Sequence, residues 1–254
     1  MSTDIFSLEG KVGVVTGASR GIGRAIALGL AQAGADVAVA ARSESDLETL
    51  AKEIDAEGRK AIAVPTDVTD RVQLEELVDR TASELGGLDI LVNNAGGTRF
   101  MAPITSLRPE GWDKSMRLNL DSVFHATQLA ALKMIETGGG SIIQVASVAA
   151  ITGSPGLSFY SAAKGGVRLM TQSVAKELAQ SGVRVNCLAP GWVATDLNAA
   201  LRDDEASNRF ATDMIPMGRW GEVDEIVGGA IYLASDAASF VTGATLVIDG
   251  GQTA

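Results

Sequence analysis

The chain has 254 residues, of which 46% are hydrophobic, and it contains 29 glycines, so it can bury one large core as an α/β domain. Its formal net charge is −10 and it has no basic stripe, which argues against a nucleic-acid-binding protein. Its one cysteine, Cys187, excludes an internal disulfide framework, and without a secretory signal or an apolar run of roughly 18 residues we expect a cytoplasmic protein.

Short apolar runs rich in Val and Ile alternate with helical stretches, a pattern typical of βαβ units in a parallel sheet buried on both faces. The expected strands are Val12–Thr16, Asp36–Ala41, Ala61–Pro65, Ile90–Asn93, Ser141–Ala146, Arg184–Leu188 and Thr245–Ile248. Expected helices that end at a glycine suited to a left-handed cap are Ile22–Ala33, Leu47–Ala56 and Gln73–Leu85. The sequence therefore predicts a single doubly wound (Rossmann) domain over residues 1–254. It has a seven-stranded parallel sheet, helices on both faces and a ligand crevice at the carboxyl ends of the strands.

The segment from about Thr195 to Pro216 breaks this alternation. It carries Asp203-Asp204-Glu205 among mixed apolar residues. We expect a mobile lid over the substrate here.

A glycine cluster follows the first strand and opens a helix. Gly17, Gly21 and Gly23 allow the backbone to approach a pyrophosphate, while the helix N–H groups and dipole favour its charge. A plain tight turn is the structural alternative.

The end of the second strand indicates which nicotinamide cofactor is used. It reads Ala40-Ala41-Arg42-Ser43, without the acidic residue that would bind a free ribose 2′-hydroxyl. Arg42 and Arg20 can clamp a 2′-phosphate with planar guanidinium groups, which favours NADP(H) over NAD(H). Alternatively, Arg42 is a solvated residue at a helix start and Arg20 folds over the adenine.

Three polar residues suit proton transfer. Tyr160 and Lys164 are four residues apart in a helical stretch, so their side chains share one face. The ammonium is expected to lower the phenol pKa below about 10 and make Tyr160 an acid or base near neutrality. Ser147, just past the fifth strand, would bond the substrate oxygen. The structural alternatives are a helix cap for Ser147 and a surface charge for Lys164.

Three features together resemble one known family: these glycines, the segment Asn93-Asn94-Ala95-Gly96, and the set Ser147, Tyr160 and Lys164. The family is the short-chain dehydrogenase/reductase family, and the resemblance covers essentially the whole chain. The resemblance implies that Asp67 and Val68 contact the adenine, and that Val193 and Thr195 face the nicotinamide carboxamide. It also implies that Lys164 bonds the nicotinamide ribose. Asn119, for which a helix kink is the structural alternative, would hold a water that links Lys164 to solvent. The expected catalytic residues are Asn119, Ser147, Tyr160 and Lys164. The expected cofactor-binding residues are Gly17, Ser19, Arg20, Gly21, Ile22, Gly23, Arg42, Asp67, Val68, Asn94, Ala95, Gly96, Tyr160, Lys164, Pro190, Gly191, Val193 and Thr195.

The predicted reaction is reduction of a ketone to a secondary alcohol, with Tyr160 donating the proton, or the reverse oxidation. No metal is expected, because the only histidine, His125, has no cysteine or second histidine near it. The expected pocket is mixed and largely apolar, and is lined by Gly97, Thr98, Ser154, Phe159, Trp192 and Met214.

Three alternatives stay open. A 3-oxoacyl-acyl-carrier-protein reductase needs a basic patch, which Glu136–Gly140 lacks but to which Arg99, Arg168 and Lys176 can contribute. A sugar or polyol dehydrogenase is equally compatible with Phe6–Lys11 and with the lid. A non-catalytic dinucleotide sensor would have no need for an activated phenol.

The last expected strand indicates self-association. Ala244–Gly251 is apolar and is expected at a sheet edge, which usually needs covering. Members of the resembled family commonly form tetramers through these strands and the long helices, so we expect a homotetramer.

Overall fold

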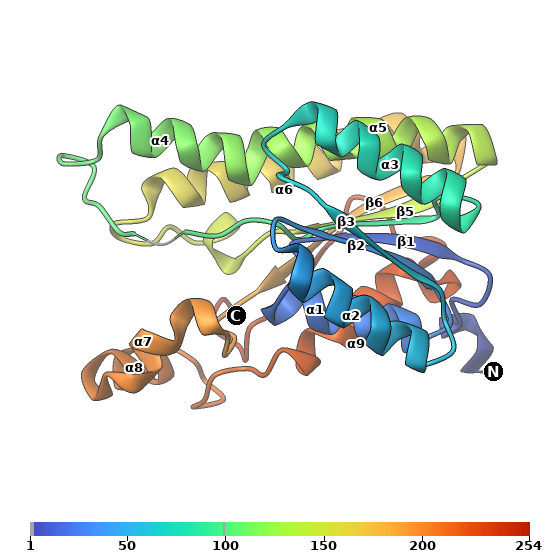
Figure 1. The fold of residues 1–254 in the computed structure, drawn as a ribbon. Coiled ribbons are helices and arrows are strands. Elements are labelled where there is room, and N and C mark those ends of the chain that lie inside the picture. Colours follow the sequence, from blue (N-terminus) through green and yellow to red (C-terminus); the bar gives the residue numbers. More distant parts are fainter. Residues whose placement is uncertain (1–2, 99) are drawn as a thin grey trace.

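A seven-stranded parallel sheet forms the centre of the structure, a computed structural model that describes residues 3–98 and 100–254 (Figure 1). The strand order is β3-β2-β1-β4-β5-β6-β7. The strands are β1 (Val12–Thr16), β2 (Asp36–Ala41), β3 (Ala61–Pro65), β4 (Ile90–Asn93), β5 (Gly140–Val145), β6 (Val183–Pro190) and β7 (Thr245–Ile248). The predicted fold class is confirmed. Five strands match their predicted bounds, β5 is shifted by one residue, and β6 extends to Pro190.

Helices cover both faces of this sheet (Figure 1). On one face lie α3 (Arg71–Leu85), α4 (Pro109–Met116), α5 (Ser122–Thr137) and α6 (Ser158–Leu178). On the other lie α1 (Gly21–Gln32), α2 (Glu44–Ala56) and α9 (Asp224–Ala234). A π-helical turn, Arg117–Asp121, joins α4 to α5, and short 3-10 turns occupy Thr3–Phe6, Val148–Ala150, Ala179–Ser181, Asp196–Asn198 and Asp236–Ala238. Helices α1, α2 and α3 begin one to three residues earlier than predicted. In α2 the reason is acidic residues, Glu44 and Asp46, which suit the first turn.

Two hydrophobic layers, one on each face, explain why the strands are apolar along their whole length. Successive residues of a strand point to opposite faces. Val15 and Val39 pack with α1 and α2, whereas their neighbours Val14 and Ala38 pack with α3 and α5. All of these side chains are fully buried. The sheet is therefore held from both sides, and its ends are the places where polar groups can gather.

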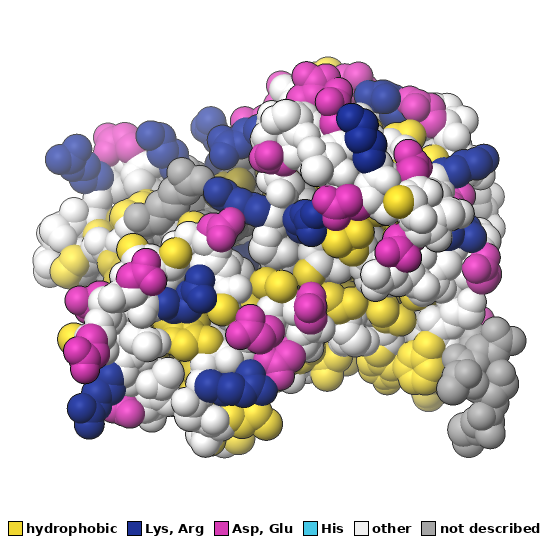
Figure 2. All heavy atoms as spheres, turned by 60° about the horizontal axis from the view of Figure 1, so that its bottom comes forward, with side chains coloured by type: hydrophobic (Ala, Val, Ile, Leu, Met, Phe, Trp, Pro, Cys, Tyr) yellow, Lys and Arg dark blue, Asp and Glu magenta, His cyan; other side chains and the backbone are white. Residues whose placement is uncertain are grey.

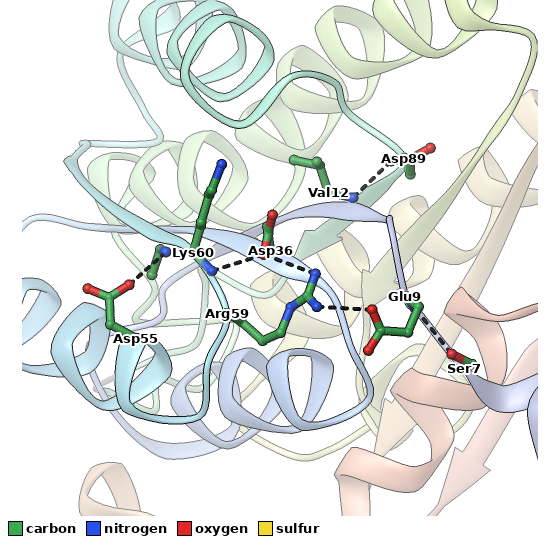
Figure 3. A network of polar contacts seen from close by, with 9 residues as sticks. Ser7, Glu9, Val12, Asp36, Asp55, Arg59, Lys60 and Asp89 are labelled. Atoms are coloured by element: carbon green, nitrogen blue, oxygen red, sulfur yellow. Dashed lines mark hydrogen bonds and ion pairs between the residues drawn. The ribbon is translucent and has the colours of Figure 1, made fainter.

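The amino ends of the strands carry a network of mutually paired charges (Figure 3). The Arg59 guanidinium lies 3.0 Å from a Glu9 carboxylate oxygen and 3.1 Å from Asp36 Oδ1. The Asp89 carboxylate accepts a hydrogen bond from the Val12 N–H, 2.8 Å away. These contacts fix β1, β2 and β4 relative to one another at this edge.

The carboxyl ends of the strands carry the loops that hold the predicted site residues. The strand order reverses between β2-β1 and β1-β4, so a crevice opens beside the end of β1. The predicted lid segment, residues 195–216, is mostly helical: after the turn Asp196–Asn198 it forms α7 (Ala199–Asp203) and α8 (Glu205–Asp213). In Figure 1 these two helices stand apart from the helices on the sheet faces, at the lower left.

Strand β7 lies at an edge of the sheet, as predicted, and Val247 on it is 36% exposed. Among the described helices, none combines the length and apolar character that a membrane crossing requires.

Candidate active site

The glycine loop after β1 has a shape that only glycine permits. Gly17 has a φ of +67° and Gly21 a φ of +56°, both in the left-handed region. A Cβ on Gly17 would lie 2.8 Å from Ala95 Cα, and one on Gly23 would overlap the Gly17 carbonyl and Asn94 Nδ2. The loop therefore packs closely against the end of β4.

Thr16 and Asn94 bind this loop to the neighbouring strand. Thr16 Oγ1 accepts hydrogen bonds from the N–H groups of Asn94 and Ala95, each at 3.1 Å. Asn94 Nδ2 donates to the Thr16 carbonyl at 2.9 Å and to the Gly17 carbonyl at 3.2 Å. The Asn94 side chain thus shapes the loop. Sequence reasoning missed Thr16, although a polar residue that ends an apolar strand was a usable signal.

The start of α1 fits a phosphate group. Arg20 occupies the N-cap position in an extended conformation and its side chain makes no capping hydrogen bond. A Cβ on Gly21 would contact Thr195 Cγ2 at 3.4 Å, so the loop after β6 packs against the helix start. A groove of about 500 Å³ adjoins the helix start and is lined in part by Gly21, Arg24 and Thr195. Helix N–H groups that no side chain caps suit an anion, so the glycine loop and the start of α1 fit the pyrophosphate of a dinucleotide.

The region expected to bind the adenosine lies at the ends of β2 and β3. Arg20 and Arg42 are both exposed, whereas Val68 is buried. Hydrogen bonds from Thr69, first from its N–H, lower the pKa of Asp67, and the charge of Arg42 adds to this effect. Arg42 is therefore close to Asp67, and its exposed guanidinium lies at the end of β2, near the predicted ribose position.

The predicted catalytic residues converge at the ends of β5 and the start of α6. Lys164, which is 2% exposed, donates from Nζ to the Val145 carbonyl at 2.7 Å, and its Nζ lies 5.9 Å from the centroid of the Tyr160 ring. Ser147 follows β5, and its Oγ accepts a hydrogen bond from the Ala149 N–H at 3.1 Å. Ser147 is therefore a cap of a 3-10 turn and a neighbour of Tyr160 at the same time.

The sequence predicts that the Lys164 ammonium lowers the pKa of the Tyr160 phenol. For the protein without a bound cofactor or substrate, this prediction is wrong. Burial raises the pKa of the phenol, because a phenolate would lose its hydration, and the Ser147 side chain only partly opposes this. Burial also lowers the pKa of Lys164 to about 8. The ammonium stands over the ring face rather than against the hydroxyl, so its charge does not overcome the desolvation.

Asn119 lies in the π-helical turn between α4 and α5, a type of irregularity often found at functional sites. Its Oδ1 accepts from the Gly97 N–H at 2.7 Å, and its Nδ2 donates to the Gly97 carbonyl at 3.1 Å. A Cβ on Gly96 would lie 2.8 Å from Asn119 Oδ1 and 3.3 Å from Lys164 Nζ. Asn119 and Lys164 therefore converge on the backbone of Gly96. The water that would join Asn119 to Lys164 stays a prediction.

The loop after β6 reaches across to the glycine loop. Gly191 donates from its N–H to the Ile248 carbonyl at 3.0 Å, and a Cβ on it would clash with Asp249. Val193 is buried and pairs with Gly221, and Thr195 forms a capping box with Asn198. Pro190, Gly191, Val193 and Thr195 thus form a rigid connection from β6 to the lid segment.

Phe159 does not line the pocket as expected. It is fully buried, and the ring of Phe100 stacks on it at a centroid distance of 4.5 Å. Phe100 is 43% exposed and covers Phe159, the residue next to Tyr160. Trp192 is half-buried against the edge of Trp220, and Met214 is 45% exposed. Arg99, considered above for a carrier protein, lies outside the described residues.

Residues 17–253 match the family model described as enoyl-(acyl carrier protein) reductase. The chain is 40% identical over 250 residues to the gluconate 5-dehydrogenase of Gluconobacter oxydans, covering 98% of this chain and 97% of that protein. It is 42% identical over 244 residues to the 3-oxoacyl-[acyl-carrier-protein] reductase FabG of Thermotoga maritima, covering 96% and 98%. Among solved structures, a gluconate 5-dehydrogenase from Burkholderia cenocepacia in complex with NADP and tartrate superposes with a TM-score of 0.94. That protein is 42% identical, and 98% of each chain is covered.

Proposed function

Because the chain belongs to the short-chain dehydrogenase/reductase family of oxidoreductases, we propose that it reduces a ketone to a secondary alcohol with NADP(H) and catalyses the reverse oxidation. The observation that carries this proposal is the position of Ser147, Tyr160 and Lys164. They lie together at the carboxyl edge of the sheet, where the glycine loop also lies. A proton donor and an anion-binding loop at one edge are what a coupled transfer of hydride and proton requires.

The nicotinamide supplies or accepts the hydride when it is bound. Tyr160 keeps its proton over a wide pH range, because burial raises the phenol pKa, and so it is available to protonate an alkoxide. Ser147 lies beside the phenol and bonds the same substrate oxygen. When Tyr160 gives its proton to the alkoxide it becomes a negatively charged phenolate, and the buried Lys164 ammonium, 5.9 Å from the ring centroid, stabilises that charge.

Arg20 and Arg42 support a preference for NADP(H) over NAD(H). Both guanidinium groups are exposed near the end of β2, and Ala41 stands where an acidic residue would repel a 2′-phosphate. Similar solved structures, from Burkholderia cenocepacia and Agrobacterium tumefaciens, are described with bound NADP.

Two alternatives within the family follow from the relatives. A carrier-protein reductase needs basic residues near the site mouth. Lys176, however, lies 16 residues beyond Tyr160 on α6, about 24 Å along the helix at 1.5 Å per residue. Arg168 is only partly exposed. The relatives do not separate the two alternatives, because a gluconate 5-dehydrogenase is 40% identical and a 3-oxoacyl-[acyl-carrier-protein] reductase is 42% identical; the positions of Lys176 and Arg168 favour the sugar or polyol dehydrogenase.

The test follows nicotinamide absorbance with NADPH and NADH, each offered with a ketone ester, an acetoacetyl thioester and an oxidised sugar. We expect turnover with NADPH and the ketone ester. Turnover restricted to a sugar alcohol in the oxidative direction would replace ketone reduction by the polyol dehydrogenase. Tight NADPH binding without any turnover would support the dinucleotide sensor instead.

We also propose that the enzyme is a homotetramer that works in the cytoplasm. The exposed edge strand β7, with Val247 36% exposed, and the fully exposed Phe240 support association. Light scattering at micromolar protein concentration tests this, and a monomer would contradict it.

A further inference from the structure

We infer that the substrate is an uncharged, largely apolar ketone rather than a sugar acid, an inference that rests on the proposed function and concerns the same site. Three features of the region around Tyr160 and the lid segment, called the site mouth below, support this inference. They are the apolar side chains beside Tyr160, the unburied apolar side chains of the lid segment, and the charge of that segment.

Apolar side chains pack against the segment that leads into the proton donor. The exposed ring of Phe100 is stacked on Phe159, the residue before Tyr160. Met101 is 67% exposed and lies against Gly156, where an added Cβ would meet its Cε at 3.4 Å. The Ala102 N–H donates to the Gly156 carbonyl at 2.9 Å, which anchors this segment between Ser147 and Tyr160. Of the described residues on this side, Phe100 and Met101 offer a hydroxyl-rich ligand no hydrogen-bonding side chain.

The lid segment presents a second apolar surface. Leu197 is 52% exposed, and its Cδ2 would lie 3.3 Å from a Cβ on Gly97, so it reaches the backbone next to the catalytic edge. Leu201, Phe210 and Met214 on the following helices are also exposed, by 40%, 65% and 45%. Figure 2 shows hydrophobic side chains in yellow, with charged side chains around them, on the part of the surface where the lid segment lies. Covering such side chains with an apolar ligand removes them from water, which favours binding.

The charge of the lid segment opposes an anionic substrate. It carries five acidic side chains, Asp196, Asp203, Asp204, Glu205 and Asp213, and two basic ones. The two basic groups do not cancel this charge: Arg202 donates from one terminal nitrogen to the Thr195 carbonyl at 3.4 Å while its buried Nε has no partner among the described residues, and the exposed Arg209 lies 3.9 Å from the Asp213 carboxylate. A carboxylate such as that of gluconate would therefore meet like charges as it enters.

The test compares ketones that differ only in charge or in apolar size. We would measure kcat/KM for reduction of ethyl acetoacetate, of its longer alkyl esters, of acetoacetate itself and of a keto derivative of gluconate. We expect the ethyl ester to exceed the free acid by about tenfold or more, and the value to rise with each added alkyl carbon. Equal or faster turnover of either carboxylate overturns the inference while the proposed function stands. No turnover of any ketone, with NADPH still binding, overturns both.

Two variants test whether the lid segment causes the preference for uncharged, apolar ketones. At low salt, Asp203→Lys is expected to lower the ratio of kcat/KM for the ethyl ester to kcat/KM for the free acid about threefold or more. Glu48→Lys makes an equal charge change on α2 and is expected to leave this ratio unchanged. Leu197→Ser is expected to lower kcat/KM for the longest ester about tenfold and for the free acid much less. Val72→Ser is its control, on an apolar residue of α3 that is 70% exposed, against 52% for Leu197. Unchanged ratios in both lid variants would contradict the inference.

Discussion

The two ends of the sheet contain similar kinds of side chain but use them differently. At the amino ends, Arg59 lies between the carboxylates of Glu9 and Asp36, so its charge is matched by protein groups (Figure 3). At the carboxyl ends, Arg20 and Arg42 are exposed, and Lys164 is buried with a backbone carbonyl as its acceptor. Charges matched within the protein stabilise the fold, whereas the carboxyl-end charges remain available to a ligand. Substitutions at the carboxyl ends should therefore change activity, and those at the amino ends should change stability.

Apart from the loss of the Tyr160 hydroxyl, the largest effect is expected at Ser147. Ser147→Ala should lower kcat/KM for ketone reduction about 10²- to 10³-fold, because a hydrogen bond to the developing oxyanion is lost. Stability should fall by no more than about 1 kcal/mol, the value of a cap. Ser147→Thr keeps the hydroxyl and should restore much of the activity, while Ser173→Ala on α6 should change neither quantity. If Ser147→Ala lost enough stability to account for its lower activity, the two ends of the sheet would not differ in the way described above.

The second effect is a pH dependence of stability caused by Lys164. Its pKa of about 8 in the folded protein lies below its ordinary value of 10.5, so the unfolded chain binds more protons between these values. Stability therefore rises with pH through this window, and the cost of burying the ammonium is fully present below pH 8. The wild-type protein should gain roughly 3 kcal/mol relative to Lys164→Met between pH 7 and pH 10.5.

Urea unfolding of both proteins at the two pH values measures this difference. Tyr160 is present in both proteins, so its own titration largely cancels. Lys176→Met, on an exposed lysine of the same helix, should show no such pH-dependent difference. A pH-independent difference for Lys164→Met would show that the ammonium is not desolvated.

The third effect sharpens the assignment of the cofactor. Arg42→Ala should raise KM for NADPH about 10- to 100-fold and leave KM for NADH nearly unchanged, because a charge-assisted bond to the 2′-phosphate is lost. Arg80→Ala, which removes an exposed arginine paired with Glu84, is the control. Equal changes for both cofactors would mean that Arg42 does not distinguish them.

The smallest effect is expected at the amino ends. Arg59→Met should lower the free energy of unfolding by about 1 kcal/mol, because Glu9 and Asp36 lose their shared partner. Its kcat/KM should equal that of the wild-type protein. Arg80→Met removes an ordinary exposed helix pair and should cost less. A drop in activity without a drop in stability would show that the two ends are coupled.

Local sequence patterns predicted the strands and helix ends well, because an apolar run such as Val12–Thr16 and a glycine such as Gly86 act through the backbone and the nearest core. Sequence patterns also predicted that Ser147, Tyr160 and Lys164 lie together. The patterns failed where the burial of a side chain decides its pKa. The spacing of Tyr160 and Lys164 fixes a shared face but not the burial that raises the phenol pKa.

Contacts between distant segments were equally hidden. Phe159 precedes Tyr160 in the chain, but the stacking of Phe100 removes it from the pocket. Thr16 gains its role from Asn94, which is 78 positions away.

The most direct test of the central claim replaces the phenol hydroxyl alone. We would measure kcat/KM for ketone reduction and the binding of NADPH in Tyr160→Phe, with Tyr232→Phe, the other tyrosine of the chain, as the matched control. The proposed mechanism predicts a loss of about 10³-fold or more for Tyr160→Phe, with NADPH binding retained and full activity in the control. Activity in Tyr160→Phe close to that of the wild-type protein would contradict the role of Tyr160 as proton donor.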